Sequence, residues 1–298
     1  MSPETIVLVL LSAGIHVGWN LMTKSSSSPK IFTLLMGIVT IGIFAVATPF
    51  IPFTSIPPNV WAYLALSGVI HTVYFLSLCN AYETGDISFV YPIERSSTAF
   101  VPVAAFVVLG ERLSLRGVTG IAIVVVCIFL IHLRGKAGTQ ISSLWHSMKR
   151  KDSLWAFITL GTVVSYTMVD KAGMVAFSRV DEIAPELRGP VYFLIDMALC
   201  FLIYWLYVWK TAKRAVARVS KHEWLRAIAA AIGIMVSYSL ILHVMQTEVV
   251  SYIVTLRQSS VLIAVLAGSL LLKEPFGRFR IIVAAVMLFG FFLVATAD

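Results

Sequence analysis

The chain has 298 residues, of which 59% are hydrophobic and 13% are charged, and its mean hydropathy is +0.90. A soluble domain carries roughly 25% charged residues, and this much apolar surface cannot be buried inside a soluble protein of this size. Composition therefore excludes a soluble protein and predicts an all-α integral membrane protein. The net charge of +8 does not indicate nucleic-acid binding, because the basic residues fall in short loops between apolar runs, as the positive-inside rule explains.

Ten apolar runs of about 18–24 residues follow in chain order, each close to the ~20 residues that cross a bilayer as a helix. The first has no basic segment before it and no small-residue cleavage site after it, which indicates a retained helix rather than a signal peptide. The longest connection, residues 134–153, is too short to hold a soluble domain. The runs span residues 4–23, 31–51, 59–81, 87–109, 116–133, 154–171, 189–209, 225–246, 249–272 and 279–296.

Basic residues predict which side of the membrane each loop faces. The connection 134–153 and the loop "KTAKRAVARVSKH" between the seventh and eighth runs are strongly basic and lie on one face. We expect this face to be cytoplasmic, which places both termini on the non-cytoplasmic side of a plasma membrane, the inner membrane of a bacterium.

The two halves of the chain repeat one another. "SAGIHVGWNLMTK" (12–24) aligns with "TLGTVVSYTMVDK" (159–171), and "YPIERSSTAFVPV" (91–103) aligns with "IVTLRQSSVLIAV" (253–265), so that Arg95 meets Arg257. Each half then holds five helices, and an odd number makes the second half enter the membrane from the opposite side. We therefore predict ten transmembrane helices in two inverted five-helix repeats, 1–133 and 154–298, joined by a basic cytoplasmic linker, 134–153.

The two copies end in "VLGERLSLRG" and "LLKEPFGRFR", and the first begins with "HVGWNLMTK". In these motifs the chain resembles, over its whole length, the EamA family of the drug/metabolite transporter superfamily. The resemblance implies a ten-helix transporter of small polar metabolites that works by alternating access. Related small multidrug exporters use a membrane-buried Glu in the first helix, where this sequence has His16 instead and Glu4 only at the edge.

Two arginines lie within apolar runs, Arg95 about eight and Arg257 about nine residues in, or ~12–13 Å deep at 1.5 Å per residue. An Arg at this depth costs at least ~2.5–3.5 kcal/mol unless it faces protein or water. One interpretation is a pair of clamps for a carboxylate, phosphate or phosphonate, because guanidinium is a planar bidentate donor. The other is structural, with Glu94 as the local partner of Arg95. Arg257 has no adjacent acid and is the stronger candidate for substrate contact.

Other polar and aromatic side chains in the runs are candidates for the same cavity. His16, Asn20 and Lys24 share one face of the first helix. For His16, Asp196 and Glu94 we consider proton coupling; for Lys24, Asp170 and Lys171 we consider a gate or ion pair. Glu111 and Glu274 are interpreted as loop ion pairs. The candidate substrate-binding residues are Arg95, Arg257, Trp19, Asn20, His16, Tyr91, His71, Tyr74 and Tyr238.

The predicted function is secondary transport of a small polar organic solute with an acidic group, with proton coupling left open. A lipid-linked carrier flippase and an exporter of cationic or aromatic drugs are the alternatives. No Gly-rich phosphate loop or HExxH motif occurs, and the three cysteines stand singly. We therefore expect no catalytic residue, metal, cofactor or enzyme activity. The expected partners are the solute and the bilayer, with a monomer sufficient and a dimer allowed.

Overall fold

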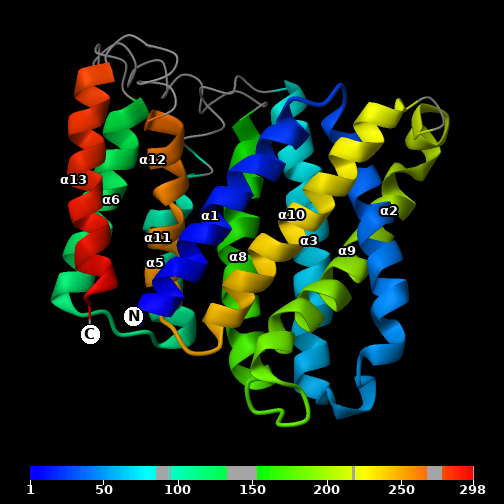
Figure 1. Cartoon of the computed structure of the whole chain (residues 1–298), viewed down its shortest axis with the longest axis horizontal. Coiled ribbons are helices and arrows are strands. Elements are labelled where there is room, and N and C mark those ends of the chain that lie inside the picture. Colours follow the sequence, from blue (N-terminus) through cyan, green and yellow to red (C-terminus); the bar gives the residue numbers. More distant parts are fainter. Residues whose placement is uncertain (85–92, 94, 133–152, 217–218, 267–276, 298) are drawn as a thin grey trace.

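A computed structural model describes residues 1–84, 93, 95–132, 153–216, 219–266 and 277–297, and these residues form helices and turns without a strand among them (Figure 1). The all-helical prediction is confirmed for this part of the chain. Two short 3₁₀ turns, Thr48–Phe50 and Phe53–Ser55, lead from the second helix to the third. The helices are α1 Pro3–Lys24, α2 Pro29–Ala47, α3 Pro58–Thr84, α5 Ser97–Leu109, α6 Leu115–His132, α8 Ser153–Phe177, α9 Pro185–Val216, α10 Lys221–Met245, α11 Val250–Arg257, α12 Ser259–Leu266 and α13 Gly277–Ala295.

Several helices meet the requirements of a membrane span. Among the described residues, α1, α3, α9, α10 and the segment Pro29–Phe50 are long and apolar enough to cross a bilayer. Large apolar side chains lie on the outer surface, with Phe50 83% and Val107 75% exposed. A protein in water would bury such side chains, so these surfaces indicate contact with lipid. The chain is a multi-pass membrane protein.

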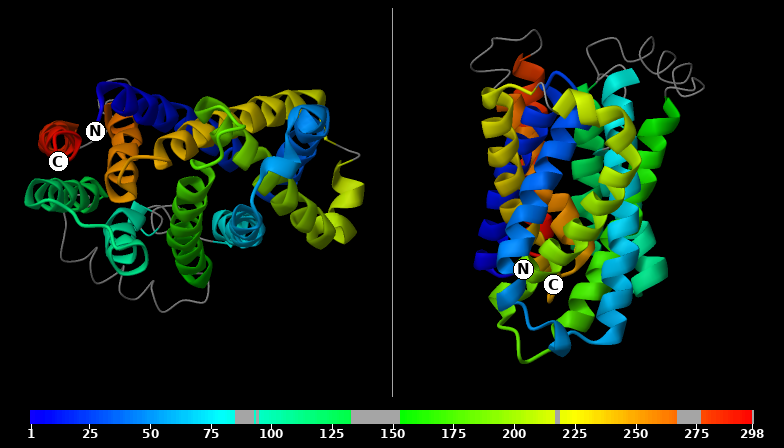
Figure 2. Two further views of the ribbon diagram at one scale, coloured as in Figure 1. Left: turned by 90° about the horizontal axis from the view of Figure 1, so that it is seen from below. Right: turned by 90° about the vertical axis from the view of Figure 1, so that its right-hand side faces the viewer.

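The helices form a bundle that is longer in one direction than the other (Figures 1 and 2). α13 pairs with α6 at one edge, and α2 packs against α9 at the other. Between them α1 runs along α10, and α3 packs against both α8 and α9. Both termini lie at the same end of the bundle, where the Met1 amino group donates to the Ala295 carbonyl at 3.4 Å.

The ninth predicted helix, 249–272, is not continuous. α11 ends at Arg257, Gln258 forms a turn, and α12 begins at Ser259. The turn is closed by i→i+3 bonds, from Gln258 N–H to Thr255 O (3.1 Å) and from Val261 N–H to Gln258 O (2.8 Å), which tighten the backbone. A single helix across this run was therefore a wrong expectation.

A second turn interrupts the helix that contains Arg95. Ser96 forms the turn directly before α5, with hydrogen bonds from Ser96 N–H to Ile93 O (3.0 Å) and from Ala99 N–H to Ser96 O (2.8 Å). Residues 85–92 of this predicted run lie outside the described residues. Each arginine is thus followed immediately by a turn residue, and the two turns share one hydrogen-bond pattern.

Within the described part of the chain, the loop carboxylate Glu111 does not form the ion pair expected of it. Its Oε1 accepts from the Val250 backbone N–H at 2.7 Å, and its Oε2 accepts from the Ser251 hydroxyl at 2.8 Å. A carboxylate at this place satisfies backbone donors that the first turn of α11 leaves without partners. Glu111 therefore holds the start of α11 against the end of α5. Glu274 lies outside the described residues.

Candidate functional site

A polar cavity lies between α1, α5, α8 and the turn that joins α11 to α12. Its volume is about 60 Å³, enough for several water molecules, and a metabolite would need the helices to move apart. We call it the arginine cavity, because both intramembrane arginines predicted to bind substrate line it. The lining residues are His16, Tyr74, Arg95, Ser97, Val163, Tyr166, Thr167, Val254, Arg257 and Gln258.

Arg95 reaches from the first half of the chain into the second. Its side chain is buried, and Nη1 donates to the Gln258 Oε1 atom and to the Ser260 hydroxyl, each at 3.0 Å. Both acceptors are neutral, so these two bonds position the guanidinium without cancelling its charge. The predicted neighbours Glu94 and Tyr91 lie outside the described residues.

Arg257 makes the reciprocal contact from the second half into the first. Its Nη2 donates to His16 Nδ1 at 3.0 Å, and its guanidinium lies 5.7 Å from the centre of the Tyr238 ring. Its Nε is buried without a hydrogen-bond partner, and no carboxylate of the described residues lies within ion-pair distance of it. A half-buried cation with neutral neighbours and an unused donor is suited to an anion.

The contact with Arg257 determines the tautomer of His16. Guanidinium can only donate, so His16 Nδ1 accepts and the ring hydrogen is on Nε2. The Asn20 amide nitrogen lies 2.9 Å from Nε2, and in this orientation its Oδ1 has no partner among the described residues. Turning the amide by 180° brings this oxygen to the Nε2–H and satisfies both groups. Trp19 is buried and packs edge-on against the His16 ring at 5.0 Å, so Trp19 and Asn20 support the cavity from behind His16.

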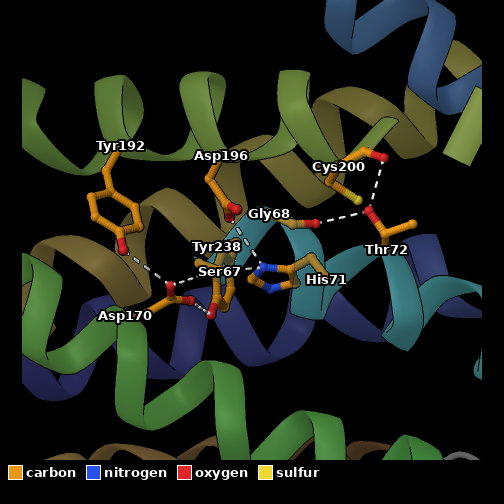
Figure 3. A network of polar contacts seen from close by, with 9 residues as sticks. All are labelled: Ser67, Gly68, His71, Thr72, Asp170, Tyr192, Asp196, Cys200 and Tyr238. Atoms are coloured by element: carbon orange, nitrogen blue, oxygen red, sulfur yellow. Dashed lines mark hydrogen bonds and ion pairs between the residues drawn. The ribbon is translucent and has the colours of Figure 1, made fainter. Parts of the chain in front are cut away.

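A second set of polar side chains lies behind Tyr166, at the meeting point of α3, α8, α9 and α10 (Figure 3). The Asp170 carboxylate accepts from Ser67 (2.5 Å), from Tyr192 (3.3 Å) and from Tyr238. His71 Nδ1 lies 3.1 Å from the Ser67 hydroxyl and 3.1 Å from Asp196 Oδ2. We call this set, Ser67, His71, Asp170, Tyr192, Asp196 and Tyr238, the polar cluster.

Close packing of α3 on α9 brings the polar cluster together. A Cβ atom on Gly68 would lie only 3.1 Å from the Asp196 carbonyl, so glycine permits this approach. The Thr72 hydroxyl lies 2.8 Å from the Gly68 carbonyl and 3.1 Å from the Cys200 carbonyl, which ties the two helices together (Figure 3). His71, one turn along from Gly68, is thereby placed beside Asp196.

Two aromatic rings separate the cluster from the cavity. His71 stacks on Tyr166 with 4.2 Å between ring centres, and Tyr166 lines the arginine cavity. Tyr238 hydrogen-bonds to Asp170 on one side and lies under Arg257 on the other. Of the predicted lining aromatics, Tyr74 is therefore at the cavity, whereas His71 and Tyr238 form the layer behind it.

The residues considered as a gate lie apart from one another. Asp170 is fully buried in the polar cluster, whereas Lys171 donates to the carbonyls of Met245 and Glu248, both at 2.8 Å. Lys24 occupies the last turn of α1. Asp170 and Lys171 therefore do not pair with each other, because adjacent helical residues point about 100° apart.

Sequence reasoning missed several lining residues, among them Tyr166, Thr167 and Gln258. Tyr166 aligns with Trp19 in the repeat, and this alignment could have identified it as a candidate. Gln258 follows Arg257 in an otherwise apolar run, but nothing local marks it as a break. In the polar cluster, His71, Asp170 and Asp196 have ligand atoms within 4.8 Å of one another. Hydroxyl donors already face the Asp170 oxygens, and His71 Nδ1 carries a hydrogen, so we assign no metal there.

Comparison with known proteins identifies a family domain in the first half of the chain. Residues 4–133 match the EamA-like transporter family. Residues 4–133 therefore carry an EamA-like domain, as the motifs of the first half predicted. This match points to a membrane transporter rather than to an enzyme.

A curated relative from Sinorhizobium sp., described as an "uncharacterized transporter in cobO 3'region", is 32% identical over 71 residues, which are 24% of this chain and 50% of the relative. The match thus spans half the length of that relative. A solved crystal structure aligns over 97% of this chain and 95% of its own with a TM-score of 0.66. At 14% identity this likeness shows a shared fold alone.

Proposed function

We propose that the protein is a secondary transporter of a small polar organic solute bearing an acidic group, such as an amino-acid-like compound, a carboxylate or a phosphonate. Arg257 carries the proposal: it is a cation within the bundle, it has an unused Nε donor, and no carboxylate of the described residues neutralises it. An acidic group entering the cavity would supply the missing charge. A cationic solute would be repelled, which disfavours the drug-exporter alternative.

The other cavity residues have roles that fit this solute. Arg95 would provide the second guanidinium, held in place by Gln258 and Ser260. His16 would hold Arg257 in position, while Tyr74 and Tyr166 would pack against the apolar part of the solute. Tyr91 and Glu94 remain predictions from the sequence.

We further propose two inverted repeats, residues 1–133 and 154–298, joined by the linker 134–153. Supporting this division, the two helix breaks lie at Ser96 and Gln258, directly after the aligned arginines, and have equivalent hydrogen bonds. Broken helices at equivalent positions of two repeats are a frequent feature of transporter binding sites. Repeats of this kind would let the bundle open to either side of the membrane in turn.

The proposed location is the inner membrane of a bacterium, with both termini outside the cytoplasm. The basic loops support this orientation, since both strongly basic segments join helix ends opposite the termini (Figure 1). One chain supplies every residue of the arginine cavity, so we expect a monomer to suffice for transport.

The proposal is tested by thermal shift of the purified protein with panels of anionic, zwitterionic and cationic metabolites, followed by uptake of the stabilising compounds into proteoliposomes. We expect stabilisation by compounds with an acidic group. Arg257→Gln should weaken their affinity at least about tenfold, because one charge-assisted interaction is worth ~1.5–3 kcal/mol.

Arg179→Gln is the matched control, because Arg179 is exposed between α8 and α9, and it should bind as the wild type does. Stabilisation by cations alone, or unchanged affinity in Arg257→Gln, would contradict the proposal. Stabilisation and movement of only lipid-linked compounds would indicate the flippase alternative.

A further inference from the structure

We infer that Asp196 and His71 form a proton-binding site coupled to the arginine cavity, so that a proton and the acidic solute cross the membrane together. The inference rests on the proposed function, since it identifies the ion that accompanies the solute. It assigns coupling to the polar cluster rather than to His16, whose Nδ1 lone pair is already used by Arg257.

The site is formed by side chains that have no access to solvent. His71 is 3% exposed, and Asp170 and Asp196 are 0% exposed. A charge buried in this way is expensive unless hydrogen bonds or an opposite charge compensate it. The two carboxylates are compensated very differently, and this difference identifies the proton site.

Asp170 is fully provided with donors. Ser67 and Tyr192 donate to its Oδ1 and Tyr238 donates to its Oδ2, so three neutral hydroxyls stabilise the carboxylate. The Ser67 hydroxyl has only one hydrogen, and Asp170 receives it. In the contact between Ser67 and His71, the hydrogen must therefore come from the ring nitrogen, so Nδ1 is the donor.

Asp196 has almost no compensation for a negative charge. Neither of its oxygens has a hydrogen-bond partner within the described part of the chain, and its one charge contact there is with His71 Nδ1 at 3.1 Å. The hydrogen of that nitrogen is donated to Ser67. With His71 charged, the two carboxylates still leave one negative charge uncompensated. A proton on Asp196 removes this charge and costs no rearrangement of the cluster.

A metal ion fits these contacts less well than a proton. A metal needs the lone pairs of its ligands. Here His71 Nδ1 presents a hydrogen, and the Asp170 lone pairs that face the cluster hold three hydroxyl hydrogens. A metal would have to displace these donors, whereas a proton uses a lone pair of Asp196 that has no partner among the described residues.

The groups that act electrostatically on Asp196 come from the helices packed around it. α2 also packs on α9 and carries Lys30 in its first turn. The Lys30 Nζ atom is paired with Glu83 Oε2 at 2.7 Å. The groups facing the site are His71 on α3, Asp170 on α8, Tyr192 and Cys200 on α9 and Tyr238 on α10, with Arg257 of α11 beyond the Tyr238 ring.

Coupling to the cavity follows from two contacts. Tyr238 joins Asp170 to the face beneath Arg257, and His71 stacks on the cavity residue Tyr166. An anion bound at Arg257 brings negative charge toward two buried carboxylates, which favours a proton on Asp196. By linkage the proton favours the anion equally, so both bind together and both leave together.

Proton binding can be measured without any solute. Infrared difference spectra of the protein in nanodiscs, recorded through a pH jump, should contain the C=O band of a protonated buried carboxyl group that shifts in D₂O. The band should be absent in Asp196→Asn and present in Asp181→Asn, an exposed acid between α8 and α9. His71→Gln, which keeps Asp196, should move the pH at which the band is lost.

A band that persists in Asp196→Asn, or its absence from the wild type at every pH, overturns the assignment. So does a band that responds to replacing choline chloride with NaCl at constant pH, since it would identify a metal cation. In proteoliposomes, an inward pH gradient should accelerate uptake of the stabilising acidic compound, and Asp196→Asn should reduce this gradient-driven uptake at least about tenfold. Uptake that does not depend on the pH gradient contradicts proton coupling but not the proposed function. Absence of uptake of any compound contradicts the proposed function and does not affect the infrared result.

Discussion

At the scale of single residues, the described hydrogen-bond acceptors of Arg95 and Arg257 are neutral. Arg95 is held by an amide and a hydroxyl, and Arg257 by an imidazole. A carboxylate at any of these places would hold the guanidinium more strongly, but it would also neutralise the charge that attracts a solute. On the proposed function, Gln258 beside Arg95 therefore favours solute binding over stability.

Gln258→Glu tests this interpretation. A carboxylate about 3 Å from Arg95 would form an ion pair within the bundle, so we expect an unchanged or higher melting temperature without ligand. Affinity for acidic compounds should fall at least about tenfold, because an internal anion competes with them. Thermal shift with and without the compound measures both effects.

Gln246→Glu is the matched control for that variant. Gln246 Oε1 accepts from Arg188 Nη1 at 3.1 Å, so this change also creates an arginine–carboxylate pair, but away from the cavity. It should leave affinity unchanged. Equal affinity in Gln258→Glu and the wild type would show that the charge of Arg95 does not contribute to binding.

At the scale of elements, α6 and α13 form a pair held by backbone proximity. A Cβ atom on Gly120 would lie 2.8 Å from the Gly290 carbonyl, and one on Gly290 would lie 3.1 Å from the Gly120 carbonyl. Helices in a bilayer gain little from burying apolar surface, so such close contact of small residues provides much of the association. These two helices form one edge of the bundle (Figure 1).

Gly120→Leu should separate this pair. The new side chain would meet backbone atoms that cannot move aside, and overpacking of this kind costs about 1–3 kcal/mol. We expect a melting temperature several degrees lower in detergent, measured by intrinsic fluorescence. Gly14→Leu is the control, because nothing lies within 4 Å of a Cβ at Gly14 and its side chain would face outward. Equal stability of the two variants would contradict a close α6–α13 contact.

At the scale of the whole molecule, the proposed repeat has a consequence for the opposite conformation. In this structure Arg95 donates to Gln258 and Ser260. In the repeat, Ser96 aligns with Gln258 and Thr98 aligns with Ser260. If the two halves exchange their roles, Arg257 would therefore donate to Ser96 and Thr98. Thr98 is fully buried, and its hydroxyl has no partner within the described residues, which leaves it available for that state.

Thr98→Val should therefore affect transport without affecting stability. Removing an unpartnered buried hydroxyl is neutral or slightly stabilising in the present conformation. The opposite conformation would lose an acceptor for Arg257, so uptake into proteoliposomes should slow several-fold. Melting temperature and uptake are measured on the same preparation.

Ser260→Ala is the counterpart in the other repeat. Ser260 is already bonded to Arg95, so its loss should lower the melting temperature by an amount corresponding to about 1–2 kcal/mol. If Thr98→Val is destabilised as much as Ser260→Ala, or transports at the wild-type rate, exchange of roles between the halves is not the mechanism.

Much of this protein could be derived from its sequence, because membrane constraints act on contiguous residues. Runs of about 20 apolar residues must be helices in lipid, since every backbone donor and acceptor needs an internal partner. An arginine inside such a run must face protein or water, so Arg95 and Arg257 could be assigned to a cavity from their positions in the chain. The resemblance to the EamA family followed from motifs at the ends of the two copies.

Only the tertiary structure decided what each polar side chain meets. Ser67 and Asp170 are 103 residues apart in the chain, and neither pattern nor spacing relates them. Their meeting depends on how closely the helices cross, which glycines such as Gly68 permit, and on how far each helix is rotated about its axis. The break at Gln258 was equally hidden, since no glycine or proline marks it. Hydropathy along the chain reports which residues leave water, but the partners they find are determined by packing in three dimensions.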